Sequence, residues 1–530
     1  MRDTKKNSLQ SWSLADGFRK IRVGVLVSMV AALALSLLVA CGGDDKVVDA
    51  EADTGIKTGG TLKVGMLSDH STLDPQLLLG IPDIVTAQHT YDTLVFRNPD
   101  STIQPGLAES WSANDDGSEW TFNLRKGVKF SNGKDFKAED VIFTFTRLFA
   151  LDSPLASVMA EPTAIVAVDD YTVRFEFGAP NAVLLDAVVK YHASIAPSNV
   201  DPARLVNETF GTGPFVMTEL VVGETATFTK NADYWWDGHP YVDEVIFVFL
   251  PDPQSRAAAL KAGSIDIIYD MNTSSVTTIE ADPGTVVLQA ASGSYMNLAM
   301  NTTEPPFDNV LVRRAVQAAT DRSAILQTAQ LGLGGIAYDH PVTPADPVFN
   351  EECKPPDYDP DLARDLLEQA GYTDGIDLTL HTSTGGAAMV EMATVLKESF
   401  LPAGINLDIV VMTEDGYWSE GWMVKPFTTV WWGGRPPFEA FSVVYQSEAS
   451  WNESSWNNAE ADALLVQAMA AADDASRKDV YGQLQCLVVE QAPRIIPVFR
   501  PVLLGVRNDV KGMEPMWDAT LSLHRAWLDR

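Results

Sequence analysis

The sequence predicts an α/β fold, because segments with the period of a strand alternate with segments with the period of a helix. At 376–380 every second residue is apolar, as in a strand with one solvated face. Over 389–401 apolar residues recur at three- and four-residue spacing, which predicts a helix, and alternation returns at 405–411. A strand–helix–strand unit of this length is expected to close as a crossover between parallel strands.

Elements of the same two kinds are predicted on either side of this unit. Asp359 and Pro360 are the residue types that begin a helix, and Gly371 follows its expected end. Residues 120–125 alternate as a strand, and we expect 126–133 to turn this strand back as a hairpin.

A ligand site is expected where the parallel strands end. Open parallel sheets bind ligands in the crevice beyond the carboxyl ends of their strands. These ends are 382–386, 412–416 and, after a third predicted strand at 428–431, residues 432–435. The first and third loops are rich in glycine, which lets backbone approach a bound molecule closely.

The third loop combines indoles and a cation. Trp431 and Trp432 precede Gly433, Gly434 and Arg435. Such residues suit a pocket, but the alternative remains open that the indoles pack in a core and Arg435 is a surface charge. Because successive side chains of a strand face opposite ways, at most one indole can face the crevice.

Residues 1–40 are predicted to be a signal peptide. Basic residues precede an apolar run from 23 to 40, the pattern of a secretory signal. Leu-Val-Ala at 38–40 is followed directly by Cys41, which resembles the lipobox of bacterial lipoproteins, where the signal is cleaved before the cysteine and the thiol receives a diacylglyceryl group. The alternative is an uncleaved membrane anchor of about 17 residues, which is marginal for a span.

Residues 41–58 are predicted to be a lipidated cysteine followed by an acidic, flexible tether, because they contain almost no large apolar side chains. The two remaining cysteines are Cys353 and Cys486. An exported compartment permits a disulfide between them, although nothing in their spacing shows that they pair.

The composition and the motifs argue against several functions. The chain has a formal net charge of −33, and its first 40 residues carry +4, so the remainder carries −37. Such an acidic body repels nucleic acid. The sequence contains no His-Glu-x-x-His pair, no G-x-S-x-G elbow and no phosphate-binding loop. We therefore expect binding rather than catalysis, with no catalytic residues, no cofactor and no metal site.

A collinear series of motifs covers nearly all of residues 59–530. It consists of the run 105–147, Gly-Thr-Gly-Pro-Phe at 211–215, Asn-Ala-Asp-Tyr-Trp at 231–235, Ala-Ala-Ala-Leu-Lys-Ala-Gly-Ser-Ile-Asp at 257–266, Asn301, Pro-Pro-Phe-Asp at 305–308, Val-Arg-Arg-Ala-Val at 312–316 and residues 493–497. Together they resemble the solute-binding proteins of peptide/nickel ABC importers, family 5, which include dipeptide- and oligopeptide-binding proteins.

The resemblance implies an α/β, periplasmic-binding-protein-like fold of type II, cluster C. It has two lobes joined by a hinge, and a small α+β domain is inserted in the first lobe. Carried over to this chain, lobe I comprises 59–94, 215–297 and 497–530, the inserted domain is 95–214, and lobe II is 298–496.

Residues of both lobes are candidates to face the ligand where strands meet the crevice. The indoles could stack on a ring or a cation, and Arg435 could bind a carboxylate or another anion in a bidentate way. The candidates are Ser68, His70, Tyr295 and Asn297 from lobe I, and Trp418, Trp431, Trp432, Gly433, Gly434 and Arg435 from lobe II.

Two departures from the family pattern bear on the ligand. Family peptide binders usually carry an aspartate, which pairs with the peptide's amino group, in the loop that here reads Gly433-Gly434-Arg435. Dipeptide binders tend to carry an arginine near the stretch matching 382–386, and this chain has none there. Both departures weaken a simple dipeptide assignment.

The resemblance implies an exported, lipid-anchored receptor that captures a peptide or peptide-like solute and delivers it to the permease and ATPase subunits of an ABC importer. We expect a monomer that is held at the membrane by its lipid. A non-peptide solute such as an opine, an oligosaccharide or a metal chelate is an alternative. A secreted hydrolase on a two-lobed scaffold is the alternative of another class.

Overall fold

The computed structural model describes residues 55–530 apart from short gaps at 79, 99–101, 152, 158, 385–387, 414–415, 472 and 517–519. The predicted signal peptide, Cys41 and most of the predicted tether lie outside the described residues. Among the described helices, none combines the length and the apolar character that crossing a membrane requires.

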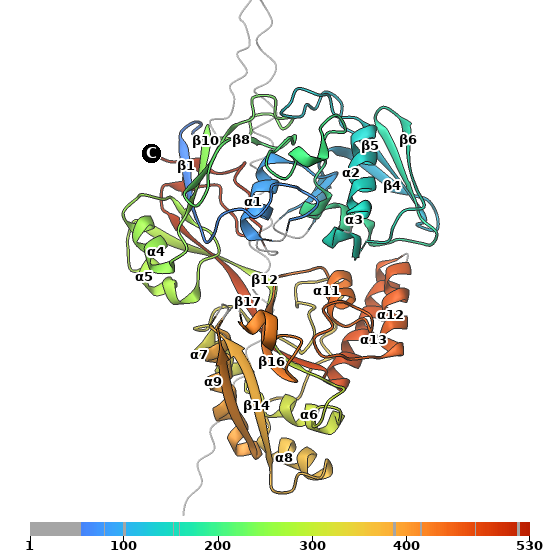
Figure 1. Cartoon of the computed structure of the whole chain (residues 1–530), viewed down its shortest axis with the longest axis vertical. Coiled ribbons are helices and arrows are strands. Elements are labelled where there is room, and N and C mark those ends of the chain that lie inside the picture. The colour runs from blue at the N-terminus through green and yellow to red at the C-terminus, as the bar shows by residue number, and fades with distance from the viewer. Residues whose placement is uncertain are drawn as a thin grey trace, which may run out of the picture. The chain divides into compact units, whose positions relative to one another are not determined.

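One sheet of eleven strands dominates the described part of the chain (Figure 1). Its strands, in spatial order, are β15 (Ile405–Met412), β14 (Ile376–Ser383), β16 (Phe427–Trp432), β12 (Thr285–Met300), β17 (Arg494–Arg507), β11 (Ile267–Ile268), β1 (Thr61–Met66), β10 (Glu244–Phe249), β9 (Thr225–Lys230) and β8 (Phe215–Val221), and β13 (Gly335–Ile336) pairs with β17.

The predicted crossover unit is confirmed at one end of this sheet. Strand β14 pairs with β15 in parallel, from Ile376 opposite Ile405 to Ser383 opposite Met412. Helix α9 (Met389–Phe400) connects the two strands and buries the face that carries Leu396. Strand β16 joins β14 in parallel as well, so the carboxyl ends of all three strands lie at the same edge.

The other helices are assigned as follows. They are α1 (Ile81–Thr90), α2 (Ala138–Ala150), α3 (Leu184–Val188), α4 (Pro253–Lys261), α5 (Val276–Glu280), α6 (Val310–Ala318), α7 (Arg322–Ala329), α8 (Pro360–Gln369), α11 (Pro437–Val444), α12 (Ala459–Ala470) and α13 (Asp474–Gln491). The predicted start of α8 is confirmed, because the Asp359 side chain accepts hydrogen bonds from the backbone N–H groups of Asp361 and Leu362.

Strands β12 and β17 join two parts of the molecule that have separate apolar cores. One core includes residues of β14, β15, α6 and α9, and the other includes residues of β1, β8, β9 and β10. The antiparallel pair β12–β17 contributes to both cores and passes between the upper and lower parts of Figure 1. A bend in this pair would leave each core intact, which is what a two-lobed, hinged fold requires.

The predicted inserted domain, residues 95–214, contains a separate four-stranded sheet. Its order is β4 (Ala108–Ala113), β5 (Glu119–Leu124), β7 (Thr172–Glu176) and β6 (Ala164–Asp169), all antiparallel. The predicted hairpin after β5 is wrong: β5 pairs with β4 and β7, and residues 126–137 make one isolated bridge, Lys129 to Asp135. The glycines of that segment form tight turns, but its few apolar residues point into the core instead of pairing as a strand.

Two small ladders complete the strand list. They are β2 (Val95–Arg97) with β3 (Ile103–Pro105), and β18 (Val510–Lys511) with β19 (Trp527–Leu528).

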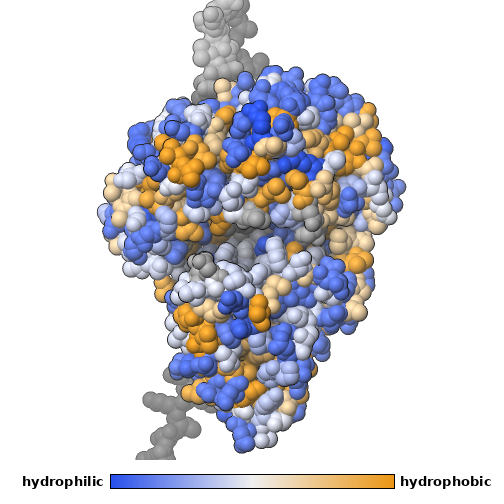
Figure 2. Space-filling view, viewed as in Figure 1, coloured by the Kyte–Doolittle hydropathy of each residue, from blue (hydrophilic) through white to orange (hydrophobic). Residues whose placement is uncertain are grey.

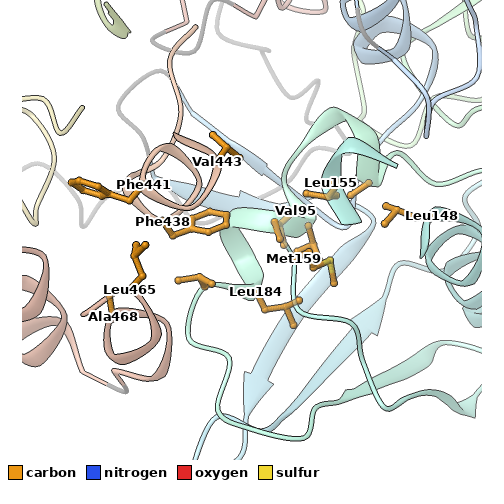
Figure 3. Packing of buried hydrophobic residues seen from close by; sticks show 14 of the residues in the cluster. Val95, Leu148, Leu155, Met159, Leu184, Phe438, Phe441, Val443, Leu465 and Ala468 are labelled. Atoms are coloured by element: carbon orange, nitrogen blue, oxygen red, sulfur yellow. The ribbon is translucent and has the colours of Figure 1, made fainter. Parts of the chain in front are cut away.

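A third apolar cluster connects the predicted inserted domain to helices of lobe II. Figure 3 shows Val95 and Leu184 in the same cluster as Phe438 of α11 and Leu465 of α12. The backbone N–H of Ala182 also donates to the carbonyl of Met469 at the end of α12 (3.2 Å). These contacts hold residues 95–214 against lobe II. The exact domain boundaries stay a prediction.

A disulfide joins Cys353 to Cys486 of α13, with the two Cα atoms 4.6 Å apart. It ties the loop that follows β13 to a long helix of the same lobe, and the closed chain segment spans 133 residues.

Candidate functional site

The outer surface drawn in Figure 2 is a mixture of small hydrophilic and hydrophobic areas. On this face a cavity is therefore a better candidate for a ligand site than an exposed apolar patch. A cavity of about 920 Å³ opens along the β12–β17 pair. Its walls are formed by 289–293 of β12, 499–501 of β17, the segments 334–336 and 341–348, residues 435–438 at the start of α11, parts of 474–481 on α13, and Arg97, Thr102, Val183 and Asp186 from the predicted inserted domain.

A smaller space of about 180 Å³ adjoins the same region, because Arg97 and Pro436 line both cavities. Its distinctive group is Asp92, which accepts hydrogen bonds from Trp235 Nε1 (2.9 Å) and Thr212 Oγ1 (2.8 Å). Burial nevertheless raises the pKa of Asp92 to about 6.

Of the ten predicted ligand residues, only Arg435 lines the large cavity. Its Nε lies 3.1 Å from Glu439 Oε1, its Nη1 donates to the carbonyl of Gly433 (3.2 Å), and its Cζ lies 5.0 Å from the ring centroid of Trp432. Glu439 also pairs with Lys190 of the predicted inserted domain (2.7 Å). Burial opposes ionisation of Glu439, yet Lys190 and Arg435 hold its pKa below the usual value.

Three of the predicted residues lie around the buried ion pair of Glu453 and Arg494. Asn297 Nδ2 and Trp432 Nε1 donate to Glu453 Oε1 at 2.7 and 3.3 Å. Tyr295, on the same face of β12 as Asn297, is buried beside Arg494, and burial raises its pKa to about 12. These contacts are internal to the protein, and none of the three residues lines either cavity.

The other predicted residues from lobe II do not form a common site with Arg435 in the large cavity. Trp431 is half-buried, with the guanidinium of Arg500 over its ring (5.4 Å to the centroid). Trp418 is exposed and contacts Trp422 edge to face. Gly434 follows Gly433 in the loop toward Arg435, and neither glycine lines the large cavity.

Ser68 and His70 lie in the loop after β1, away from both cavities. Ser68 is exposed. The ring of His70 is hydrogen-bonded to the side chains of Asp69 (3.1 Å) and Thr86. These contacts fix the loop to α1. Burial lowers the pKa of His70, although the carboxylate of Asp69 acts to raise it.

Sequence reasoning missed Glu453 and Arg500. Glu453 lies in a loop of mixed polarity, where nothing in the sequence distinguishes it from other acidic residues. Arg500 could have been recognised from the sequence, because it is the one charged residue in the apolar run 495–506. A cation at such a position needs a partner or a function.

Among the described residues no group of three or more His, Cys, Asp and Glu side chains could hold a metal ion. The arrangement is that of a binding cavity, with aromatic and aliphatic walls and a few cations.

Comparisons with known proteins agree with this geometry. The chain is 29% identical to haem-binding protein A of Haemophilus influenzae over 88% of this chain and 92% of the relative. It is 30% identical to di/tripeptide-binding protein 1 of Pseudomonas aeruginosa over 76% of this chain and 81% of the relative. The structure of the periplasmic binding protein DppA of Helicobacter pylori in complex with the peptide STSA superposes with a TM-score of 0.76 at 27% identity, covering 89% of this chain and 99% of that one.

The family model described as bacterial extracellular solute-binding proteins, family 5, middle region, matches residues 102–454. These residues include β12, the crossover unit, Arg435 and Glu453, so the match covers most of the region that builds the cavity. The chain belongs to the family 5 bacterial extracellular solute-binding proteins.

Proposed function

We propose that this protein is the substrate-binding lipoprotein of an ABC import system and that it captures a peptide or peptide-like solute in the cavity along β12 and β17. The observation that carries the proposal is the composition of the cavity walls. They come from lobe II, from the predicted inserted domain and from both strands of the connecting pair. The volume of about 920 Å³ falls within the range of roughly 300–1,000 Å³ that is usual for small-molecule sites.

A solute held by such walls touches lobe II, the predicted inserted domain and the connecting strands at once, so its contacts add to those that hold these parts together. Only a ligand with different affinities for the open and closed forms can shift the equilibrium between them. Contacts with Arg97 on one side and Arg435 on the other provide that difference, and the Lys190–Glu439 ion pair joins the same two parts. The closed form is the species that a permease would recognise.

The relatives support a peptide ligand, because one is named for di- and tripeptides and a solved neighbour holds the peptide STSA. A non-peptide solute is the second candidate. Two observations favour it: a relative of similar identity is named for haem, and no acidic residue occupies the loop Gly433-Gly434-Arg435, where family peptide binders hold the amino group.

The lipid anchor at Cys41 is part of the proposal. The pattern of residues 1–41 supports export followed by lipidation, and the acidic stretch before residue 59 provides reach between the membrane and the folded part. We expect the protein to act as a monomer on the outer side of the membrane, with the permease and ATPase subunits of an importer as partners.

Incubation of the purified mature chain with an equimolar pool of di-, tri- and tetrapeptides, followed by gel filtration and mass spectrometry, tests the proposal against the hydrolase alternative. The account predicts that intact peptides elute with the protein and that the free pool is unchanged over hours. Cleaved peptides, or no peptide retained at any concentration, would contradict it.

A further inference from the structure

The charges that line the large cavity have the opposite balance to those of the whole chain. Over the full sequence 71 carboxylates outnumber 38 cations. In the cavity lining five cationic side chains face three carboxylates; these are Arg97, Arg435, Arg477, Lys478 and Arg500 against Asp186, Asp346 and Asp474. An acidic protein that collects cations around one cavity favours anions there.

Most of these charges are already compensated. Arg97 pairs with Asp186, Arg477 pairs with Asp474 (3.1 Å), and Arg435 pairs with Glu439. In the part of the chain that the structure describes, no carboxylate lies within 4.0 Å of the Arg500 guanidinium. Among the described residues, Arg500 is therefore a cation in the cavity wall that forms no salt bridge.

A β-bulge positions this cation. Ala291 pairs with Pro501 and Tyr295 pairs with Phe499, so 292–294 stand opposite the single residue Arg500. Bulges of this kind change the direction of a side chain and are common beside functional sites. The bulge is fixed internally, because Ser292 Oγ donates to the carbonyl of Arg500 (2.5 Å) and Ser294 Oγ donates to the carbonyl of Trp432 (2.8 Å).

The guanidinium has two neutral neighbours that orient it. Its Nη1 lies 3.4 Å from Ser294 Oγ, and its Cζ lies 5.4 Å from the ring centroid of Trp431. Neither neighbour neutralises the charge. Burial lowers the pKa of Arg500, and the charge of Asp270, which forms no salt bridge with it, only partly opposes this effect.

We infer that Arg500 is a specificity-determining residue that pairs with a carboxylate of the bound solute, so that the protein selects anionic ligands. The inference rests on the proposed function and names the class of solute that the same cavity takes. A carboxylate would complete the bidentate geometry that a guanidinium offers. Its source is either the free C-terminus of a peptide or an acidic side chain.

Three synthetic tripeptide mixtures distinguish these sources. The first is built from Ala, Ser, Val and Phe with free C-terminal carboxylates, the second has the same sequences with C-terminal amides, and the third is amidated and contains one Glu. Affinity is measured by tryptophan fluorescence titration of the wild-type chain, Arg500→Gln and Arg500→Lys. Lys397→Gln removes an equal charge from an exposed position on α9 outside the cavity and is the control.

We expect the wild-type chain to bind the first or the third mixture more tightly than the second. Arg500→Gln is expected to weaken that binding by roughly 10- to 100-fold, which is the usual effect of losing a charged hydrogen bond. Arg500→Lys is expected to retain part of the affinity, and Lys397→Gln to match the wild type.

Equal affinity of the wild-type chain for acid and amide mixtures, unchanged in a folded Arg500→Gln variant, would overturn the inference and leave the proposed function standing. Absence of binding of all three mixtures to the wild-type chain would overturn the assignment to peptides and this inference with it. Thermal unfolding of each variant confirms that it is folded before it is titrated.

Discussion

Glu453 and Arg494 form an ion pair that is closed to solvent: Oε1 of Glu453 lies 2.9 Å from Nη2 of Arg494, and neither side chain is exposed. Asn297, Trp422 and Trp432 donate further hydrogen bonds to Glu453. The guanidinium of Arg494 also lies over the ring of Tyr445, with Cζ 4.8 Å from the centroid. This network fixes β12, β16 and β17 to one another beside the loop that leads to Arg435.

Glu453→Gln should therefore lower the free energy of unfolding by about 3–5 kcal/mol, because it leaves a buried cation without its counter-charge. The double variant Glu453→Gln/Arg494→Met should lose less than the sum of the two single variants. Urea denaturation of the four proteins measures both quantities. Additive losses would show that the pair is not coupled.

Buried histidines should make stability depend on pH. Burial lowers the pKa of His340 to about 3 and that of His89 to about 4. A histidine with a lowered folded pKa is protonated first in the unfolded chain, so its contribution to stability is complete above about pH 6.5 and is lost as the pH falls toward the folded pKa. Buried carboxyls such as Asp92, with a pKa of about 6, act in the opposite direction.

Because these effects oppose one another, the prediction compares the pH dependence of the unfolding free energy of the wild type with that of a His340 variant. Between pH 6 and pH 4 the unfolding free energy of His340→Gln should fall less steeply than that of the wild type, by about 1.4 kcal/mol per pH unit. Chemical denaturation at several pH values measures both slopes. Identical slopes would mean that His340 titrates normally in the folded state.

Much of the fold follows from local sequence patterns. The unit β14–α9–β15 was predictable because its apolar residues change from a period of two to a period of 3.6 and back. The start of α8 was predictable from Asp359 and Pro360. The error after β5 has a simple reason: local turn residues indicated a hairpin, but pairing of β5 with β7 depends on a segment almost 50 residues farther along.

The candidate site was less predictable than the fold. The end of β16 was expected to lead to a ligand site, and Arg435 there lines the cavity; its part in ligand binding stays a prediction. The alternating pattern of a strand did not reveal that Trp432 and Asn297 donate hydrogen bonds to a buried carboxylate, because that carboxylate, Glu453, lies in a separate loop. The bulge at 292–294, which sets the position of Arg500, depends on the register of two strands that are about 200 residues apart in sequence.

Removal of the disulfide should destabilise the protein without changing the cavity. Cys353 and Cys486 are separated by 133 residues, and loss of such a link typically costs about 2–5 kcal/mol. Denaturation of Cys353→Ala/Cys486→Ala should show this loss, and dithiothreitol should lower the stability of the wild type toward that of the variant. Equal stability of the variant and the oxidised wild type would show that the bond does not contribute.

The lipid anchor can be tested in cells. We expect Cys41→Ser to move the protein from the membrane fraction to the soluble exported fraction, since the proposed thiol acceptor is lost. Cys353→Ala/Cys486→Ala, which keeps Cys41 and leaves no unpaired cysteine in the folded part, is the control. Continued fractionation of Cys41→Ser with membranes would contradict lipidation at this residue.

Native mass spectrometry of the purified chain tests most directly whether the cavity along β12 and β17 holds a small solute. Gly335→Trp places an indole in the cavity wall at a position where an added Cβ meets open space, and Val222→Trp adds the same ring at a turn that is 80% exposed. The account predicts that the wild type and Val222→Trp carry, or take up from a peptide pool, one small molecule that Gly335→Trp excludes. A folded Gly335→Trp protein that retains the solute at wild-type occupancy would contradict the account.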